Sequence, residues 1–120
     1  MSTVLVVEDS PTQMEVITGC LQKGGLTVVT ANDGKDAMTK IGNQKPDVIV
    51  LDVVLPDRSG FELCRDLKAE SSTSKIPVVI CSTKASEMDK FWGMKQGADA
   101  YLAKPVDQEE LLRTVKQLIK

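Results

Sequence analysis

The stretch Asp47-Val-Ile-Val-Leu-Asp52 decides the fold class of this chain, because four apolar residues run between two carboxylates without a polar interruption. A short apolar run of this kind is typical of a strand that is buried on both faces of a parallel sheet. The chain then turns through residues 53–60 into a helical pattern. Ligands of parallel sheets bind beyond the carboxyl ends of the strands, so we expect Asp52 to be a functional residue. Its residue type alone also fits a plain turn former.

On both sides of this stretch, short β-branched runs alternate with longer segments in which apolar residues recur three to four positions apart. We expect strands at residues 3–8, 26–31, 47–52, 76–82 and 100–103. Helices are expected from Ser10 to Gly24, over about 34–41, after Gly60, over about 86–96, and around the apolar stripe Leu111, Leu112, Val115, Leu118 and Ile119. Five βα units with right-handed crossovers predict one α/β domain over residues 1–120. Its sheet is expected to be doubly wound, parallel, five-stranded and flavodoxin-like, in the order 2-1-3-4-5.

The composition narrows the class of partner. The 120 residues carry 15 basic and 17 acidic side chains, a net charge of -2, so we expect neither nucleic acid nor an anionic membrane as a partner. The N-terminal segment has no signal-peptide pattern. The three cysteines, Cys20, Cys64 and Cys81, show no CxxC pairing and are expected to be reduced, buried residues of a cytoplasmic protein. The chain has no histidine, which excludes imidazole chemistry on its own side chains.

Polar residues follow four of the expected strands, all at the carboxyl edge of the sheet. Glu8 and Asp9 follow the first strand, Asp52 ends the third, Ser82 ends the fourth and Lys104 follows the fifth. In the order 2-1-3-4-5 the first and third strands are neighbours, so the three carboxylates should converge. Such a cluster suits Mg2+, which prefers oxygen ligands. Mg2+ beside a carboxylate, a hydroxyl and an ammonium group suits phosphoryl transfer, with Asp52 as the acceptor nucleophile.

Each of these residues also has an ordinary structural interpretation. Glu8 and Asp9 could simply favour the positive end of the first helix, Ser82 could be a cap, and Lys104 could be a solvated lysine. The combination favours a site, because unrelated structural roles would scatter these residue types instead of gathering them at one edge.

With these residues in view, the chain resembles a response-regulator receiver domain over essentially all of its 120 residues. The resemblance depends on four motifs: Val4-Leu-Val-Val-Glu-Asp9, Asp47-Val-Ile-Val-Leu-Asp52-Val-Val-Leu-Pro56 followed by Gly60, Pro77-Val-Val-Ile-Cys-Ser82, and Gly97-Ala-Asp-Ala-Tyr-Leu-Ala-Lys104-Pro105. It implies that Asp52 accepts a phosphoryl group from a phosphohistidine on a histidine kinase or phosphotransfer protein.

The same resemblance implies the roles of the other site residues. Mg2+ would be held by Glu8, Asp9, Asp52 and the backbone carbonyl of Val54. Ser82 and Lys104 would bind the phosphoryl group, and the Lys104–Pro105 peptide bond would be cis. Tyr101 stands at the family's switch position, where the ring rotates into space that the Ser82 hydroxyl leaves on phosphorylation; it could also be an ordinary aromatic at a strand edge.

The sequence departs from the family's pattern at three positions. Glu8 replaces a frequent aspartate, Val54 cannot hydrogen-bond an attacking water, and Lys84 is cationic where acidic or amide side chains are usual. From Val54 we expect the phosphorylated state to lose its phosphate slowly without help.

The resemblance also predicts how the signal would leave the domain. A receiver without an output domain acts by docking, through the face formed by the fourth helix, the fifth strand and the fifth helix, to a motility, taxis or relay component. The fourth helix carries Met88, Phe91, Trp92 and Met94, which is more apolar surface than one core stripe needs. Within the family, the chain is most similar to single-domain regulators of bacterial chemosensory and twitching-motility clusters.

Other functions are open at this point. The leading interpretation is a signalling switch that catalyses only its own phosphorylation and dephosphorylation. A small phosphatase with an aspartate nucleophile would need a second aspartate where Val54 stands, and a flavin carrier would need a glycine- and threonine-rich phosphate loop after the first strand. A receiver-like binding module that is never phosphorylated is the remaining alternative.

Overall fold

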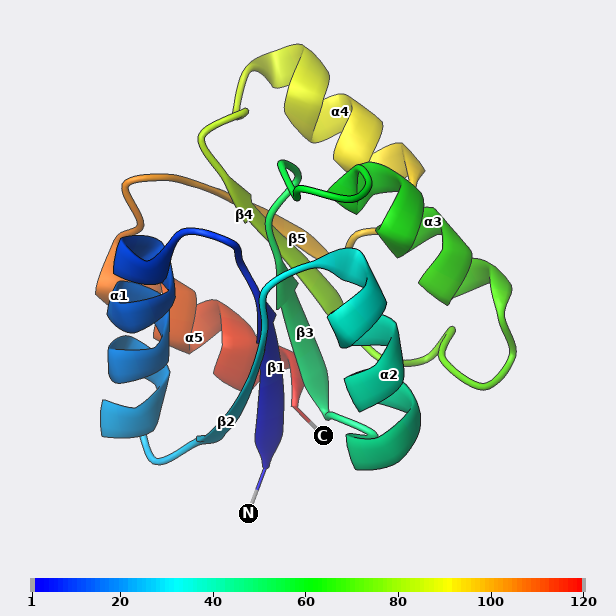
Figure 1. Cartoon of the computed structure of the whole chain (residues 1–120). Coiled ribbons are helices and arrows are strands. Elements are labelled where there is room, and N and C mark those ends of the chain that lie inside the picture. Colours follow the sequence, from blue (N-terminus) through cyan, green and yellow to red (C-terminus); the bar gives the residue numbers. More distant parts are fainter. Residues whose placement is uncertain (1, 120) are drawn as a thin grey trace.

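The computed structural model describes residues 2–119, which form five strands and five helices in alternation (Figure 1). The strands are β1 (Thr3–Val7), β2 (Thr27–Ala31), β3 (Val48–Leu51), β4 (Val78–Ser82) and β5 (Ala100–Ala103). The helices are α1 (Pro11–Lys23), α2 (Gly34–Gln44), α3 (Gly60–Ala69), α4 (Glu87–Lys95) and α5 (Gln108–Leu118). Neighbouring strands pair in parallel in the order β2-β1-β3-β4-β5, which confirms the predicted fold class and strand order.

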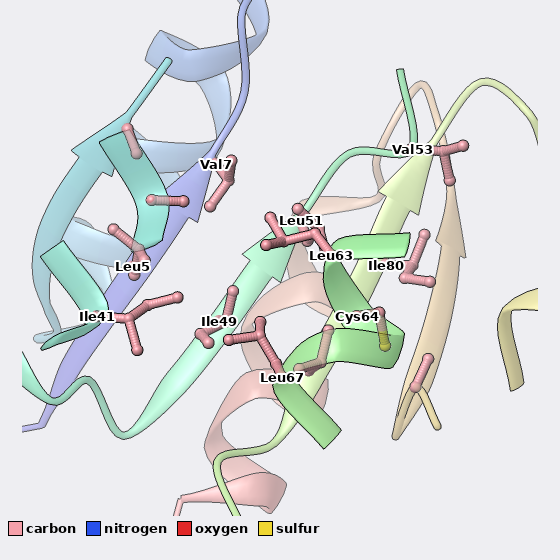
Figure 2. Packing of buried hydrophobic residues seen from close by; sticks show 14 residues of the cluster. Leu5, Val7, Ile41, Ile49, Leu51, Val53, Leu63, Cys64, Leu67 and Ile80 are labelled. Carbon is pink, nitrogen blue, oxygen red and sulfur yellow. The ribbon is translucent and has the colours of Figure 1, made fainter. Parts of the chain in front are cut away.

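The apolar strands are explained by helices on both faces of the sheet. In β3, Ile49 and Leu51 pack into the core between the sheet and helices α2 and α3, whereas Val48 and Val50 pack on the opposite side, toward α1 and α5. Figure 2 shows the first of these cores, where side chains of β1, β3 and β4 meet those of α2 and α3. Because alternate residues of each central strand face two apolar layers, the strand has no position for a polar side chain until it ends.

Two element ends differ from the predicted ones by more than one residue. The fourth strand begins at Val78 and not at residue 76, since Pro77 has no N–H group to donate to the sheet. The second helix continues past residue 41 to Gln44 and ends at Lys45, which adopts a left-handed conformation with φ of 46°. Lysine is an uncommon residue for this conformation, so no residue type at this position predicts the end of the helix.

The helices begin at polar caps. Ser10 accepts a hydrogen bond from the Gln13 amide at 3.3 Å, with Pro11 at the first helical position, as predicted. Ser86 and Asp89 form a reciprocal capping box at the start of α4. These caps begin α1 and α4 directly after the loops that follow β1 and β4, and so fix where those loops end.

Cys20, Cys64 and Cys81 are free and buried. Burial raises the pKa of the Cys64 and Cys81 thiols to about 11, so both stay protonated at neutral pH and serve as small apolar core residues. None of the helices described within residues 2–119 has the length and apolar character needed to cross a membrane.

Candidate functional site

Three carboxylates meet where β1 and β3 end. Glu8 and Asp9 directly follow β1, and Asp52 directly follows β3, its neighbour in the sheet. One carboxylate oxygen from each residue lies within 4.8 Å of those of the other two. Glu8 and Asp52 are buried, whereas Asp9 is exposed. The predicted convergence of these residues is therefore present, and the cluster opens to solvent on the Asp9 side.

The position of Asp52 is fixed by its own backbone and by the turn that follows it. Its amide donates to the Val7 carbonyl at 3.1 Å, which continues the pairing of β3 with β1. The Val54 amide donates to Oδ1 of Asp52 at 3.3 Å. Gly60 donates to the Val53 carbonyl at 2.7 Å, and a Cβ atom at Gly60 would lie 2.1 Å from the Asp52 carbonyl oxygen. Only glycine permits this close return of the chain.

Lys104 brings a positive charge to the carboxylates from the far edge of the sheet. Its Nζ atom donates hydrogen bonds to Oε1 of Glu8 and, at 3.0 Å, to Oδ2 of Asp52. The lysine side chain is 4% exposed. Its amide donates to the Ser82 carbonyl at 3.0 Å, which continues the pairing of β5 with β4, and the Lys104–Pro105 bond is cis, as the resemblance implied.

The pKa values of Glu8 and Lys104, the buried ion pair, are both raised. Burial raises the pKa of Glu8, and the hydrogen bonds from Lys104 and from the Ser10 amide only partly offset it. Burial also opposes a charge on Lys104, but its hydrogen bonds to Glu8 and Asp52 outweigh burial and raise the pKa of its ammonium group. Lys104 is therefore a permanent cation at neutral pH.

Ser82 and Tyr101 both make contact with Lys84 in the loop after β4. The buried Ser82 hydroxyl accepts a hydrogen bond from the Lys84 amide at 3.2 Å, and the Tyr101 hydroxyl donates to the Lys84 carbonyl. The Tyr101 ring lies against Gly93 of α4, where a Cβ atom would come within 2.6 Å of it. Burial, together with the negative charges of Asp89 and Asp52, raises the pKa of Tyr101 to about 12.

The donor set at this edge suits a hard divalent cation. Glu8, Asp9 and Asp52 offer only oxygen atoms, close enough together to share one ion, and the open side at Asp9 leaves room for water and for phosphate oxygens. The Lys104 ammonium group contacts Asp52 directly and could also contact an anion bound there. The arrangement can therefore hold a metal ion and stabilise negative charge on one carboxylate.

Two residues that shape this region could not be predicted from the sequence. Asp57 binds the first amides of α2, and Gly93 accommodates the Tyr101 ring. Asp57 follows Pro56 and fits an ordinary turn residue, while Gly93 lies inside a helical pattern. No local signal could identify partners that are distant in sequence.

Comparisons with known proteins identify one family and several relatives. Residues 4–116 match the family described as the response regulator receiver domain. The chain is 44% identical to protein PilH of Pseudomonas aeruginosa over 119 residues, which is 99% of this chain and 98% of PilH. It is 36% identical to the alkaline phosphatase synthesis transcriptional regulatory protein PhoP of Bacillus subtilis, covering 98% of this chain but 48% of that longer protein.

Among solved structures, the chemotaxis protein CheY4 of Vibrio cholerae superposes with a TM-score of 0.91 and 34% identity, covering 99% of both chains. The superposition therefore extends over nearly the whole of both chains.

Proposed function

Because this chain belongs to the response regulator receiver domain family, we propose that it is a stand-alone regulator that accepts a phosphoryl group on Asp52. The observation that carries the proposal is the meeting of Asp52 with Glu8, Asp9 and Lys104 at one sheet edge. The donor would be a phosphohistidine on a histidine kinase or phosphotransfer protein. An Asp52 carboxylate oxygen forms a bond to phosphorus as the phosphorus–nitrogen bond breaks, and its electron pair stays with the departing imidazole.

We assign Mg2+ to the oxygen atoms of Glu8, Asp9 and Asp52 and to the backbone carbonyl of Val54. When bound, Mg2+ would offset the repulsion between the carboxylates and the incoming phosphoryl group. Lys104 and Ser82 would bind the transferred group: the ammonium already reaches Asp52, and the Ser82 hydroxyl would exchange its contact with the Lys84 amide for one with a phosphoryl oxygen.

Tyr101 would transmit the movement of the Ser82 hydroxyl to the surface of the domain. Its hydroxyl binds the same residue, Lys84, as the Ser82 hydroxyl, and its ring packs on α4 at Gly93. A movement of Ser82 would therefore disturb both contacts of the Lys84 backbone. We propose that the phosphorylated state is read through this change in Tyr101 and α4.

We further propose that the target docks on the face formed by α4, β5 and α5. On α4, Met88, Phe91, Trp92 and Met94 are 73%, 58%, 52% and 49% exposed, an unusual amount of apolar surface for one short helix. The similarity to a chemotaxis protein supports a target in taxis or motility. Free cysteines fit a reducing cytosol as the place of action, and we expect the domain to catalyse only its own phosphorylation and dephosphorylation.

The experiment that tests this function is incubation with Mg2+ and acetyl phosphate, followed by intact mass spectrometry. We expect one acid-stable, base-labile phosphoryl adduct that needs Mg2+ and disappears in Asp52→Asn. Absence of the adduct, with a folded protein by circular dichroism, would favour a binding module that is not phosphorylated. An adduct that persists in Asp52→Asn would move the acceptor elsewhere.

A further inference from the structure

The loop between β3 and α3 is tied to the start of α2 by Asp57. Its Oδ1 accepts a hydrogen bond from the Gly34 amide at 2.9 Å, and its Oδ2 accepts one from the Lys35 amide at 3.0 Å. The first amides of a helix have no partner within the helix, and here a residue from another segment supplies two acceptors. Asp33, the N-cap, takes the Asp36 amide at 2.7 Å. Asp57 therefore completes the cap of a helix to which it does not belong.

The next residue of this loop, Arg58, packs on the start of α2. A Cβ atom at Gly34 would lie 2.8 Å from both Cγ and Cδ of Arg58 and 3.3 Å from Oδ1 of Asp57, so the close approach needs glycine at the first position of α2. Nη2 of Arg58 lies 2.5 Å from Oδ2 of Asp66 on α3. Asp57 and Arg58, which form the tip of the loop, thus fix it to α2 and α3.

At its base, the loop is closed by backbone contacts close to Asp52. Val54 and Ser59 form an isolated antiparallel bridge, and Gly60 donates to the Val53 carbonyl. The Val54 carbonyl, which is the backbone ligand in the proposed metal site, belongs to the peptide between this closed base and the tip held at Asp57. With both ends of the segment fixed, the direction of that carbonyl depends on where the tip is held.

We propose that Asp57, docked on the first amides of α2, is a positioning residue that holds the Val54 carbonyl in place to complete the Mg2+ site. The inference rests on the proposed function, and it adds a residue that touches neither the metal nor the phosphoryl group. Groups that only orient metal ligands commonly change metal affinity by about 10- to 100-fold when they are replaced.

The test compares two variants that break the contact from opposite sides. Asp57→Asn loses one acceptor and one negative charge, whereas Gly34→Ala pushes Arg58 and Asp57 away without any change in charge. Alanine also has the higher helix propensity, so a loss in Gly34→Ala does not come from a weaker helix. Asp36→Asn is the control, because it removes a charge from the same helical turn but leaves the contact with Asp57 intact.

The first readout is the Mg2+ dissociation constant, obtained from the increase in the free energy of unfolding with Mg2+ concentration. We expect Asp57→Asn and Gly34→Ala to raise it on the order of tenfold, with little change in Asp36→Asn. The second readout is the initial rate of phosphorylation by acetyl phosphate. Its half-saturating Mg2+ concentration should rise in the two variants, while the rate at saturating Mg2+ stays near that of the wild type.

Hydrogen exchange of the Gly34 and Lys35 amides would show that the contact is broken in Asp57→Asn. If these amides lose protection while the Mg2+ dissociation constant stays at the wild-type value, the positioning role is wrong. A wild-type protein that neither binds Mg2+ nor accepts phosphate would overturn the proposed function as well. A wild type that does both, beside variants with unchanged affinity, would overturn only the role of Asp57.

Discussion

The ammonium group of Lys104 is shared between Glu8 and Asp52, and all three side chains are almost completely buried. A buried carboxylate that loses its partner is left with an unscreened charge. We therefore expect Lys104→Met to lower the free energy of unfolding by roughly 3–5 kcal/mol when Mg2+ is chelated. Added Mg2+ should restore part of the loss, because a cation can take over the charge compensation.

Urea unfolding with and without Mg2+ measures both effects. Lys84→Met is the matched control, since Lys84 is half exposed and its pair with Asp89 at 3.3 Å, screened by solvent, should contribute little to stability. Equal stability of the two variants would contradict the importance assigned to the buried pair.

Gly60→Ala should disrupt the site by distorting the turn that follows Asp52. The added Cβ atom would lie 2.1 Å from the Asp52 carbonyl oxygen, and the turn would have to open to relieve this contact. We expect lower stability and a strongly reduced phosphoryl adduct by intact mass. Gly42→Ala serves as the control, because nothing lies within 4 Å of its Cβ position in α2, where alanine is favoured by about 1 kcal/mol. A Gly60→Ala variant that behaves like Gly42→Ala would show that the turn relaxes easily.

Val54→Asn should shorten the lifetime of the phosphorylated state. Val54 is 54% exposed beside Asp52, and its apolar side chain cannot orient a water molecule for attack on phosphorus. One added hydrogen bond of about 1 kcal/mol would raise the hydrolysis rate roughly fivefold. Loss of the adduct with time, measured by mass spectrometry, gives the rate. Val54→Ala should keep the slow rate, and an unaltered rate in Val54→Asn would refute this explanation.

Tyr101, the chain's one tyrosine, should lose its phenolic proton only at high pH. Its pKa is raised to about 12 by burial and by the charges of Asp89 and Asp52. The unfolded chain should titrate near 10. The native state therefore holds the phenolic proton more tightly, and the stability linked to it is complete below about pH 10 and is lost as the pH rises toward about 12. The ultraviolet absorbance of tyrosinate, followed in the folded and the urea-unfolded protein, checks both values. A native midpoint near 10 would mean that the ring is solvated.

The sequence predicted the sheet order and the meeting of Glu8, Asp9 and Asp52 because both follow from simple rules: apolar runs form central strands, and parallel strands end at one edge. It did not predict which side chains would touch there. Lys104 reaches Glu8 through a long flexible stem, and Asp57 reaches α2 across an intervening strand, so neither contact leaves a local pattern. The predicted bounds of α2 and β4 differ from the structure for a related reason: Lys45 adopts a conformation that lysine rarely takes, and Pro77 has no N–H group to extend the strand.

Helix α4 buries little of its side-chain surface against the rest of the domain. Gly93 is its buried residue, while its largest apolar groups lie in solvent. A shift or tilt of α4 would therefore uncover little apolar surface, and two positions of the helix should differ only slightly in free energy. A target protein docked on this helix, as proposed above, would then supply most of the preference for one position. Under the proposed function, the position of α4 would then be set jointly by the charge on Asp52 and by the target protein that covers Trp92.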